Sequence, residues 1–386
     1  MIYLDNAATT LIKPYAVIEA CNMWLNKFSA NPGRGGHKLS LNAGNKVYEC
    51  RELIAKLFNV DKPENIVFTL NTTMALNIAI NGFVKPGTHI VISGMEHNSV
   101  YRPVSNCGCS FSVAEPDPTG YVSVESIKKA VRSNTSLIIV SHASNVVGTI
   151  NPIKEIGEFA KSRGIVFLVD AAQTAGVLDI DVKRDNIDML AFAGHKSLLG
   201  PSGTGGLYIS PKIHLNPIIY GGTGSFSESP DQPDFLPDRF ESGTLNIVGI
   251  AGLTEGVRYI LKNTTKTIKE YEQKLTERLL EGLYNMDNLT LFGGINRIGI
   301  ISFSINNIDS VSVCNMLDSK KIAARGGMHC SPLAHKSLNT PNGLVRLSVS
   351  CFNTYSDIHN SCFKMIFYIH RLFCISFHRT EKYRHY

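Results

Sequence analysis

The chain has 386 residues, which is too long for one small hydrophobic core and favours two or three domains. Hydrophobic residues make up 44% and charged residues 18%, as in an ordinary globular protein, which excludes the disordered and fibrous classes. The formal net charge of +6 is small and falls mostly after Asp357, so we expect no nucleic-acid partner.

The cysteines and the N-terminus indicate the compartment. Nine cysteines, an odd number scattered over a long chain, do not form a disulfide framework. Cys107 and Cys109 are closely spaced, but no second pair of ligands accompanies them, so we predict no metal site. The first ten residues lack the pattern of a signal peptide, and no stretch is a convincing membrane span. We therefore expect a cytoplasmic protein with no membrane partner.

The first two-thirds of the chain alternates between helical and strand-like patterns. A second helix is expected over 39–58, after an amphipathic helix that Pro14 opens, whose apolar face holds Val17, Ile18, Cys21, Leu25 and Phe28. Helices such as 124–132 and 153–162 lie between apolar strand candidates, an alternation typical of an α/β fold with a mostly parallel, doubly wound sheet. The strand candidates are 66–70, 89–93, 136–141, 165–170, 188–193 and 206–209.

The last third of the chain predicts a second, smaller unit. Residues 211–237 are rich in Gly, Pro and Ser and read as a long irregular loop. One long helix is expected over 247–286, followed by strands over 299–305 and 344–349. We assign 14–255 to a large domain, 1–13 with 256–356 to a small α+β domain, and 357–386 to an atypical tail that we expect to pack poorly.

Two apolar strands end in reactive side chains. Asp170 follows one strand, and His195 and Lys196 follow another, so both deliver their side chains to the edge where open α/β sheets bind ligands. Pyridoxal 5'-phosphate needs a lysine for its Schiff base and an acid for its pyridine nitrogen, and Gln173 could reach its phenolic oxygen. The alternatives are a helix N-cap for Asp170 and an ordinary surface lysine for Lys196.

Other strand ends carry polar side chains that suit the same cofactor. Thr72 and Thr73 open a helix, where a phosphate would bind hydroxyls and free N–H groups, although simple capping is the alternative. His97 could stack on an aromatic cofactor, or it could have only a structural role at the end of its strand. Asn145 could donate a hydrogen bond to a ring oxygen of the cofactor, or it could simply stabilise a turn, which asparagine favours.

Cys330 lies in a glycine-containing loop, where Arg325 and His329 could favour its thiolate, the nucleophilic form. The alternative is an inert cysteine. Arg346 interrupts an apolar strand and could bind a substrate carboxylate through two hydrogen bonds, or form a structural ion pair.

The ordered set of these motifs resembles the cysteine desulfurases and selenocysteine lyases among the class V aminotransferase-like, fold-type I pyridoxal phosphate enzymes. The short loop before Cys330 is similar to that of the SufS-type branch. Ala193 and Met328 depart from residues common in that branch, and the tail from about Ile358 departs from the family's usual C-terminal helix. The motifs are 3–10 (YLDNAATT), 71–73 (NTT), 96–97 (EH), 144–149 (SNVVGT), 169–173 (VDAAQ), 194–196 (GHK), 241–244 (ESGT) and 325–330 (RGGMHC).

The resemblance implies a role for each candidate residue. Lys196 would hold the cofactor, Asp170 and Gln173 would contact its ring, and His97 would stack on it. The phosphate would be held by Thr72, Thr73 and His195, with Gly243 and Thr244 reaching across from a second subunit. Substrate would be bound by Asn145, Arg325 and Arg346, and Cys330 would accept the sulfur.

The resemblance also implies the reaction and the partners. The expected enzyme is a homodimer that converts L-cysteine, or L-selenocysteine, to L-alanine and passes sulfur from Cys330 to an acceptor or scaffold protein, as in iron–sulfur cluster assembly. The alternatives are a class V aminotransferase, a cysteine β-lyase, or a cofactor-binding protein with impaired catalysis.

Overall fold

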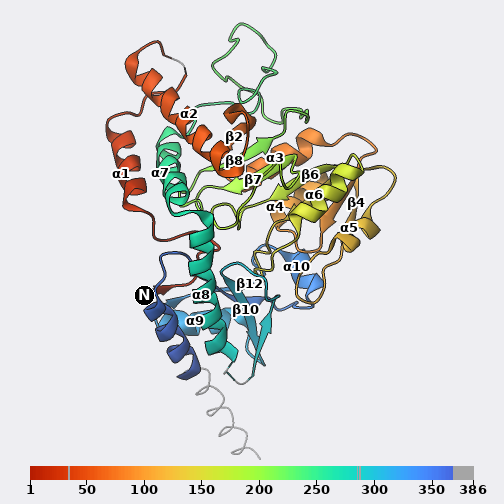
Figure 1. The fold of residues 1–386 in the computed structure, drawn as a ribbon, viewed down its shortest axis with the longest axis vertical. Helices are drawn as coiled ribbons and strands as arrows, with labels where there is room; N and C mark the ends of the chain where they lie inside the picture. The colour runs from red at the N-terminus through yellow and green to blue at the C-terminus, as the bar shows by residue number, and fades with distance from the viewer. Residues whose placement is uncertain (34, 285, 287, 368–386) are drawn as a thin grey trace, which may run out of the picture.

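The larger part of the molecule is built on a seven-stranded sheet with strand order β2-β8-β7-β6-β5-β3-β4 (Figure 1). The computed structural model describes residues 1–33, 35–284, 286 and 288–367. Strands β3, β4, β5, β6 and β7 run parallel, whereas β8 is antiparallel to both β2 and β7. These strands span Ile66–Thr69 (β2), His89–Ser93 (β3), Ser110–Ala114 (β4), Thr135–Ser141 (β5), Val166–Asp170 (β6), Met189–Ala193 (β7) and Gly205–Ile209 (β8).

Helices cover both faces of this sheet. The central strands are near-continuous apolar runs because both of their faces are buried. One face packs on α2 and α7 through residues such as Ile54 and Leu253, and the other on α3 and α4 through Leu76 and Val100. The predicted mostly parallel, doubly wound α/β fold is confirmed. The helices here are α1 (Tyr15–Asn26), α2 (Lys38–Phe58), α3 (Thr72–Phe83), α4 (Asn98–Asn106), α5 (Val124–Ala130), α6 (Ile153–Ser162) and α7 (Ile247–Asn263), with a 3₁₀ turn at Pro63–Asn65.

The smaller unit is an antiparallel sheet with strand order β12-β13-β10-β9, and it lies below the larger sheet in Figure 1. Its core includes Leu4 from the N-terminus, because β1 pairs in parallel with β11. The N-terminal segment is therefore part of this unit's packing, while the exact domain boundaries stay a prediction. The elements are β1 (Ile2–Tyr3), α8 (Thr265–Tyr284), β9 (Leu289–Phe292), β10 (Ile300–Ile305), α9 (Ser310–Ser319), β11 (Ile322–Ala323), β12 (Arg325–Gly327), α10 (Pro332–Ser337) and β13 (Leu344–Ser348).

Three expectations about the helices were wrong. The single helix over 247–286 is two helices, because Thr264 takes a left-handed φ of 65° between α7 and α8. On α1 Val17 of the predicted apolar face is buried, together with Trp24, whereas Ile18 and Leu25 of that face are 49% and 63% exposed.

The third correction concerns the start of the tail. Residues 355–367 are helical, and Ile358, Cys362 and Met365 are buried in the core of the smaller unit at the i, i+4, i+7 spacing of a helix face. The expected poor packing is therefore wrong for these residues. The remainder of the tail, 368–386, lies outside the described residues.

Candidate functional site

The carboxyl ends of β5, β6 and β7 open into one cavity of about 200 Å³. Parallel strands place their ends at one edge, so side chains far apart in the sequence converge there. The cavity brings together all the residues predicted for the cofactor ring and linkage. It is lined by Asn71, Thr72, Thr73, His97, Ser99, Ser141, Ala143, Asn145, Asp170, Ala172, Gln173, Ala193, His195 and Lys196.

Lys196 has the electrostatics of a Schiff-base lysine. Burial lowers the pKa of its amine to about 8, with Arg346 and Arg325 lowering it further and Asp170 opposing the shift. The ammonium of an ordinary lysine keeps its proton at neutral pH, whereas this amine is neutral in an appreciable fraction of molecules. The neutral amine is the form that attacks a carbonyl.

Asp170 is only 7% exposed, and its Oδ1 accepts a hydrogen bond from the Ala172 N–H at 2.9 Å. Burial raises the pKa of its carboxyl, while that N–H and Lys196 lower it. The alternative foreseen from the sequence, a helix N-cap, was wrong, because a turn and not a helix follows Asp170. The turn contact occupies one oxygen of the carboxyl only. A buried acid facing a cavity fits the protonated nitrogen of a pyridine ring.

The N-terminus of α3 fits a phosphate. Asn71 caps the helix, since its Oδ1 accepts from the Met74 N–H at 2.9 Å. Thr73 Oγ1 lies 2.7 Å from Ser99 Oγ. Thr72 Oγ1 is buried and has no hydrogen-bond partner among the described residues. A buried hydroxyl without a partner beside free helix N–H groups suits an anion, so capping and phosphate binding are both compatible here.

His97 caps the N-terminus of α4, where its Nδ1 accepts from the Ser99 N–H at 3.0 Å. Burial, aided by the charge of Lys196, lowers the pKa of His97 to about 4, so its ring is neutral near pH 7. Ser99 contacts both His97 and Thr73, and the sequence analysis missed it. Its position in the first turn of α4, two residues after the histidine, is the signal that could have identified it.

The N-terminal segment forms part of the same site. Gln173 Nε2 donates to the Ala7 carbonyl at 3.1 Å, and His195 Nδ1 lies 3.1 Å from Thr9 Oγ1. Lys13 Nζ donates to the His195 carbonyl at 2.8 Å. Residues 7–13 therefore support the wall that carries Lys196. The sequence analysis included 3–10 among the motifs but assigned no role to these residues.

Asn145 joins the cofactor cavity to the loop of Cys330. Its Nδ2 donates to the His329 carbonyl at 2.8 Å, and its Oδ1 accepts from Ser331 Oγ at 2.8 Å. Asn98 N–H, in the first turn of α4, donates to the Cys330 carbonyl at 2.8 Å. The loop is thus held against the elements that carry the predicted ring contacts.

Cys330 is exposed, and both it and His329 have left-handed backbones, with φ of 57° and 48°. Such a backbone is uncommon outside glycine and is frequent at functional sites. The Sγ atom of Cys330 lies 4.0 Å from Arg325 Nη2. Burial lowers the pKa of His329 to about 2, so this ring is neutral, and the expectation that it favours the thiolate was wrong. Arg325 supplies the nearby positive charge.

Arg346 is 2% exposed and lies opposite Arg325 in the β12–β13 pairing. Its Nη2 donates to Asp5 Oδ1 at 3.0 Å, and its Nη1 donates to the Asn145 carbonyl at 2.9 Å. The ion pair foreseen as the alternative is present. Arg346 Nε is buried without a partner among the described residues, so this guanidinium still has a donor for a substrate carboxylate.

Gly243 and Thr244 lie in neighbouring pockets rather than in the lining of the cofactor cavity. The chain segment before them is fixed by a buried pair in which Arg51 Nη1 and Nη2 donate to the two oxygens of Glu241, each at 2.8 Å. Their implied role in a second subunit's site stays a prediction.

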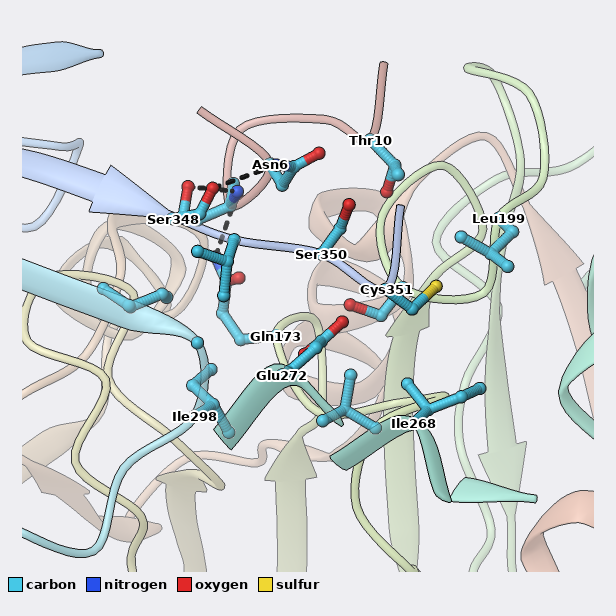
Figure 2. Close-up of a pocket in the computed structure, with 16 residues that line it drawn as sticks. Asn6, Thr10, Gln173, Leu199, Ile268, Glu272, Ile298, Ser348, Ser350 and Cys351 are labelled. Carbon is cyan, nitrogen blue, oxygen red and sulfur yellow. Dashed lines mark hydrogen bonds between the residues drawn. The ribbon is translucent and has the colours of Figure 1, made fainter. Parts of the chain in front are cut away.

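A second pocket of about 30 Å³ shares Gln173 with the cofactor cavity and has room for about one or two water molecules. Figure 2 shows Glu272, Cys351 and Ser350 around it. Burial raises the pKa of Glu272 to about 8. Within the described residues, no cluster of three or more His, Cys, Asp or Glu could hold a metal, and no helix is both long and apolar enough to cross a membrane.

The chain matches the class-V aminotransferase family over residues 2–360. It is 38% identical over 370 residues to a probable cysteine desulfurase of Methanothermobacter thermautotrophicus, covering 92% of each chain. A probable cysteine desulfurase of Pyrococcus abyssi is 36% identical over 375 residues, covering 93% of this chain and 92% of that relative.

Solved structures agree with these relatives. The apo structure of a cysteine desulfurase from Thermococcus onnurineus NA1 has a TM-score of 0.89 at 34% identity, covering 95% of this chain and 94% of that one. Cysteine desulfurase CsdA from Escherichia coli has a TM-score of 0.87 at 24% identity, covering 96% and 95%, which supports the fold alone.

The chain therefore belongs to the class-V aminotransferase family of pyridoxal phosphate-dependent enzymes, with the α/β fold of fold-type I. Within that family it groups with the cysteine desulfurases. The SufS-type branch stays a prediction.

Proposed function

We propose that this enzyme converts L-cysteine to L-alanine and takes the substrate sulfur onto Cys330 as a persulfide. The observation that supports this best is the direct link, through Asn145, between the cavity that holds Asp170 and Lys196 and the loop that carries Cys330. Pyridoxal 5'-phosphate, when bound, supplies an electron sink for bond cleavage next to Cα.

Lys196 is placed to move the Cα proton. Its lowered pKa, caused by burial, lets the amine Nζ accept a proton near neutral pH and return it later. Asp170 would keep the ring nitrogen protonated, and His97 would pack on the ring face. Thr72, Thr73 and His195 would bind the phosphate, with Arg346 on the substrate carboxylate.

Cys330 would take the sulfur by nucleophilic attack. The thiolate of Cys330, whose Sγ lies 4.0 Å from Arg325 Nη2, attacks the substrate sulfur. A sulfur–sulfur bond forms and the carbon–sulfur bond breaks, leaving its electron pair on the substrate carbon. That carbon takes a proton and becomes the methyl group of alanine, so Cys330 ends as a persulfide. A thiol reductant or an acceptor protein then removes the outer sulfur.

The test measures alanine and sulfide released from L-cysteine with dithiothreitol as reductant. We expect Cys330→Ser to keep the visible absorbance of the bound cofactor and to lose at least about 100-fold in turnover, since a covalent carrier is removed. Turnover at the wild-type rate in this variant would contradict the persulfide role.

The same assay separates the alternatives. A cysteine β-lyase would release pyruvate and ammonia without needing Cys330, and an aminotransferase would need a keto-acid acceptor. A protein with impaired catalysis would show cofactor absorbance without turnover. Parallel assays with L-selenocysteine would decide the substrate preference.

The partners are finer parts of the proposal. A sulfur-acceptor or scaffold protein, as used in iron–sulfur cluster assembly, fits the exposure of Cys330. A homodimer fits the position of Gly243 and Thr244 in pockets beside the cofactor cavity rather than in its lining. A cytoplasmic location agrees with the scattered cysteines expected from the sequence.

A further inference from the structure

Glu96 is a buried carboxyl that the proposed reaction does not use. It lies between β3 and α4, directly before His97, and is 0% exposed. No cation forms an ion pair with it in the part of the chain that the structure describes. Burying a carboxyl in this way costs free energy, so any contribution must come through the groups that it holds.

Glu96 joins the ends of two strands. Its Oε1 accepts from Ser93 Oγ, the last residue of β3, at 2.5 Å. The same oxygen accepts from the Ser141 N–H at 2.8 Å, and Oε2 lies 2.8 Å from Ser141 Oγ. Ser141 is the last residue of β5. The carboxyl therefore links the carboxyl ends of β3 and β5 on the side of the sheet where the cavity lies.

Both neighbours of this contact, Asp170 and His97, line the cavity. Ser141 is in register with Asp170 across the β5–β6 pairing, and the next N–H, that of His142, donates to the Asp170 carbonyl at 2.9 Å. On the other side, His97 follows Glu96 in the chain and caps the N-terminus of α4. One buried side chain thus connects the predicted partner of the ring nitrogen with the residue predicted to stack on the ring.

The electrostatics suit this role. Burial raises the pKa of Glu96 to about 7, and the charge of Asp170 adds to the shift, while the hydrogen bonds from Ser93 and Ser141 oppose it. Near pH 7 about half of the molecules therefore carry a neutral Glu96, which holds Ser141 without placing a second negative charge beside Asp170. In its neutral form the Oε2–H would donate to Ser141 Oγ.

We propose that Glu96 is a positioning residue, which orients Asp170 and His97 toward the cofactor ring by fixing the ends of β3 and β5. This inference rests on the function proposed above. It predicts that loss of the carboxyl changes how the ring is held, in addition to any change in stability.

The experiment compares Glu96→Ala, Glu96→Gln and a control, Glu115→Gln, which changes an exposed carboxyl after β4. The readouts are the dissociation constant for pyridoxal 5'-phosphate and the visible circular dichroism of the bound cofactor, which reports ring orientation. We expect Glu96→Ala to weaken binding at least about tenfold and to change the dichroism, because buried hydrogen-bonding groups lose their partner.

Glu96→Gln should stay within about threefold of wild type in affinity, with the same dichroism, because an amide reproduces the hydrogen bonds of the neutral acid. The control should match wild type. Wild-type affinity and dichroism in Glu96→Ala would overturn the inference.

If Glu96→Ala does not fold, Ser93→Ala replaces it, since it removes one donor to the carboxyl and leaves the cavity lining intact. A changed dichroism would support the positioning role, and an unchanged one would overturn it. A wild-type protein that neither binds the cofactor nor releases alanine would instead contradict the proposed function.

Discussion

Lys196 shows how burial tunes a single residue. The pKa of its amine is lowered to about 8 chiefly by desolvation, and Asp170 raises it. We expect acylation of Lys196 in the cofactor-free protein to reach half its maximal rate near pH 8, about two pH units below an ordinary lysine. Asp170→Asn removes the nearby negative charge, so its midpoint should fall below that of wild type.

Mass spectrometry of the labelled peptides measures this midpoint, and the exposed Lys154 on α6 serves as an internal check on the reagent. A Lys196 midpoint near pH 10, or a rise after Asp170→Asn, would contradict the electrostatic account.

The residues that could be predicted from the sequence are those at strand ends. Asp170 and Lys196 are recognisable because an apolar run precedes each of them, and the sheet then brings their ends together. The contact of Glu96 with Ser141 joins residues 45 positions apart, and no local pattern indicates it. His329 was misjudged because its neutrality comes from burial, which appears only in the folded chain.

Helix α8 carries the buried Glu272, which links its stability to pH. Burial raises the pKa of this carboxyl to about 8, against about 4.3 for an exposed glutamate. Between these values the folded state holds a proton that the unfolded state has lost. The contribution of Glu272 to the free energy of unfolding therefore decreases as pH rises from about 4.5 to 8.

Glu272→Gln removes this titration. Relative to wild type, the variant should gain more than about 1 kcal/mol in the free energy of unfolding between pH 5 and pH 8. Denaturant unfolding at both pH values, at fixed protein and cofactor concentration, measures the difference. A pH-independent difference between variant and wild type would argue against a buried, titrating Glu272.

Helices and strands could be predicted where a single sequence pattern, such as an apolar run, determines them. The predictions were wrong where packing between elements determines the buried face or the helix end. Six strands of the large sheet were recognised within a residue or two because they are apolar on both faces. The edge strand β4 was missed, because its residues are largely half-buried or exposed. The apolar face of α1 was misassigned because several of its apolar residues are exposed, so periodicity alone could not identify the buried stripe. The helix break at Thr264 could not be predicted, because the sequence there contains no glycine or proline to mark the end of a helix.

At the scale of the whole molecule, the loop 211–237 extends as the green segment at the top of Figure 1. It exposes apolar side chains, with Tyr220 at 71% and Phe226 at 60%. The loop is tied to the segment of Gly243, whose N–H donates to the Gly222 carbonyl at 2.9 Å. Exposed apolar residues beside a predicted cross-subunit contact favour this face as the homodimer interface.

The double variant Tyr220→Glu, Phe226→Glu should therefore shift the protein from dimer to monomer. In the dimer the new glutamates of each subunit would be buried in the interface without a positively charged partner. Because Gly243 and Thr244 would then leave the partner's phosphate site, the affinity for pyridoxal 5'-phosphate should also fall, by about tenfold or more. Light scattering measures the mass, and cofactor titration measures the affinity. Glutamates at two exposed positions of the smaller unit, Ile295 and Tyr284, add the same charge, provide the control and should change neither quantity. A variant that stays dimeric would exclude this face, and a monomer with full affinity would exclude a role for the partner's Gly243 and Thr244 in holding the phosphate.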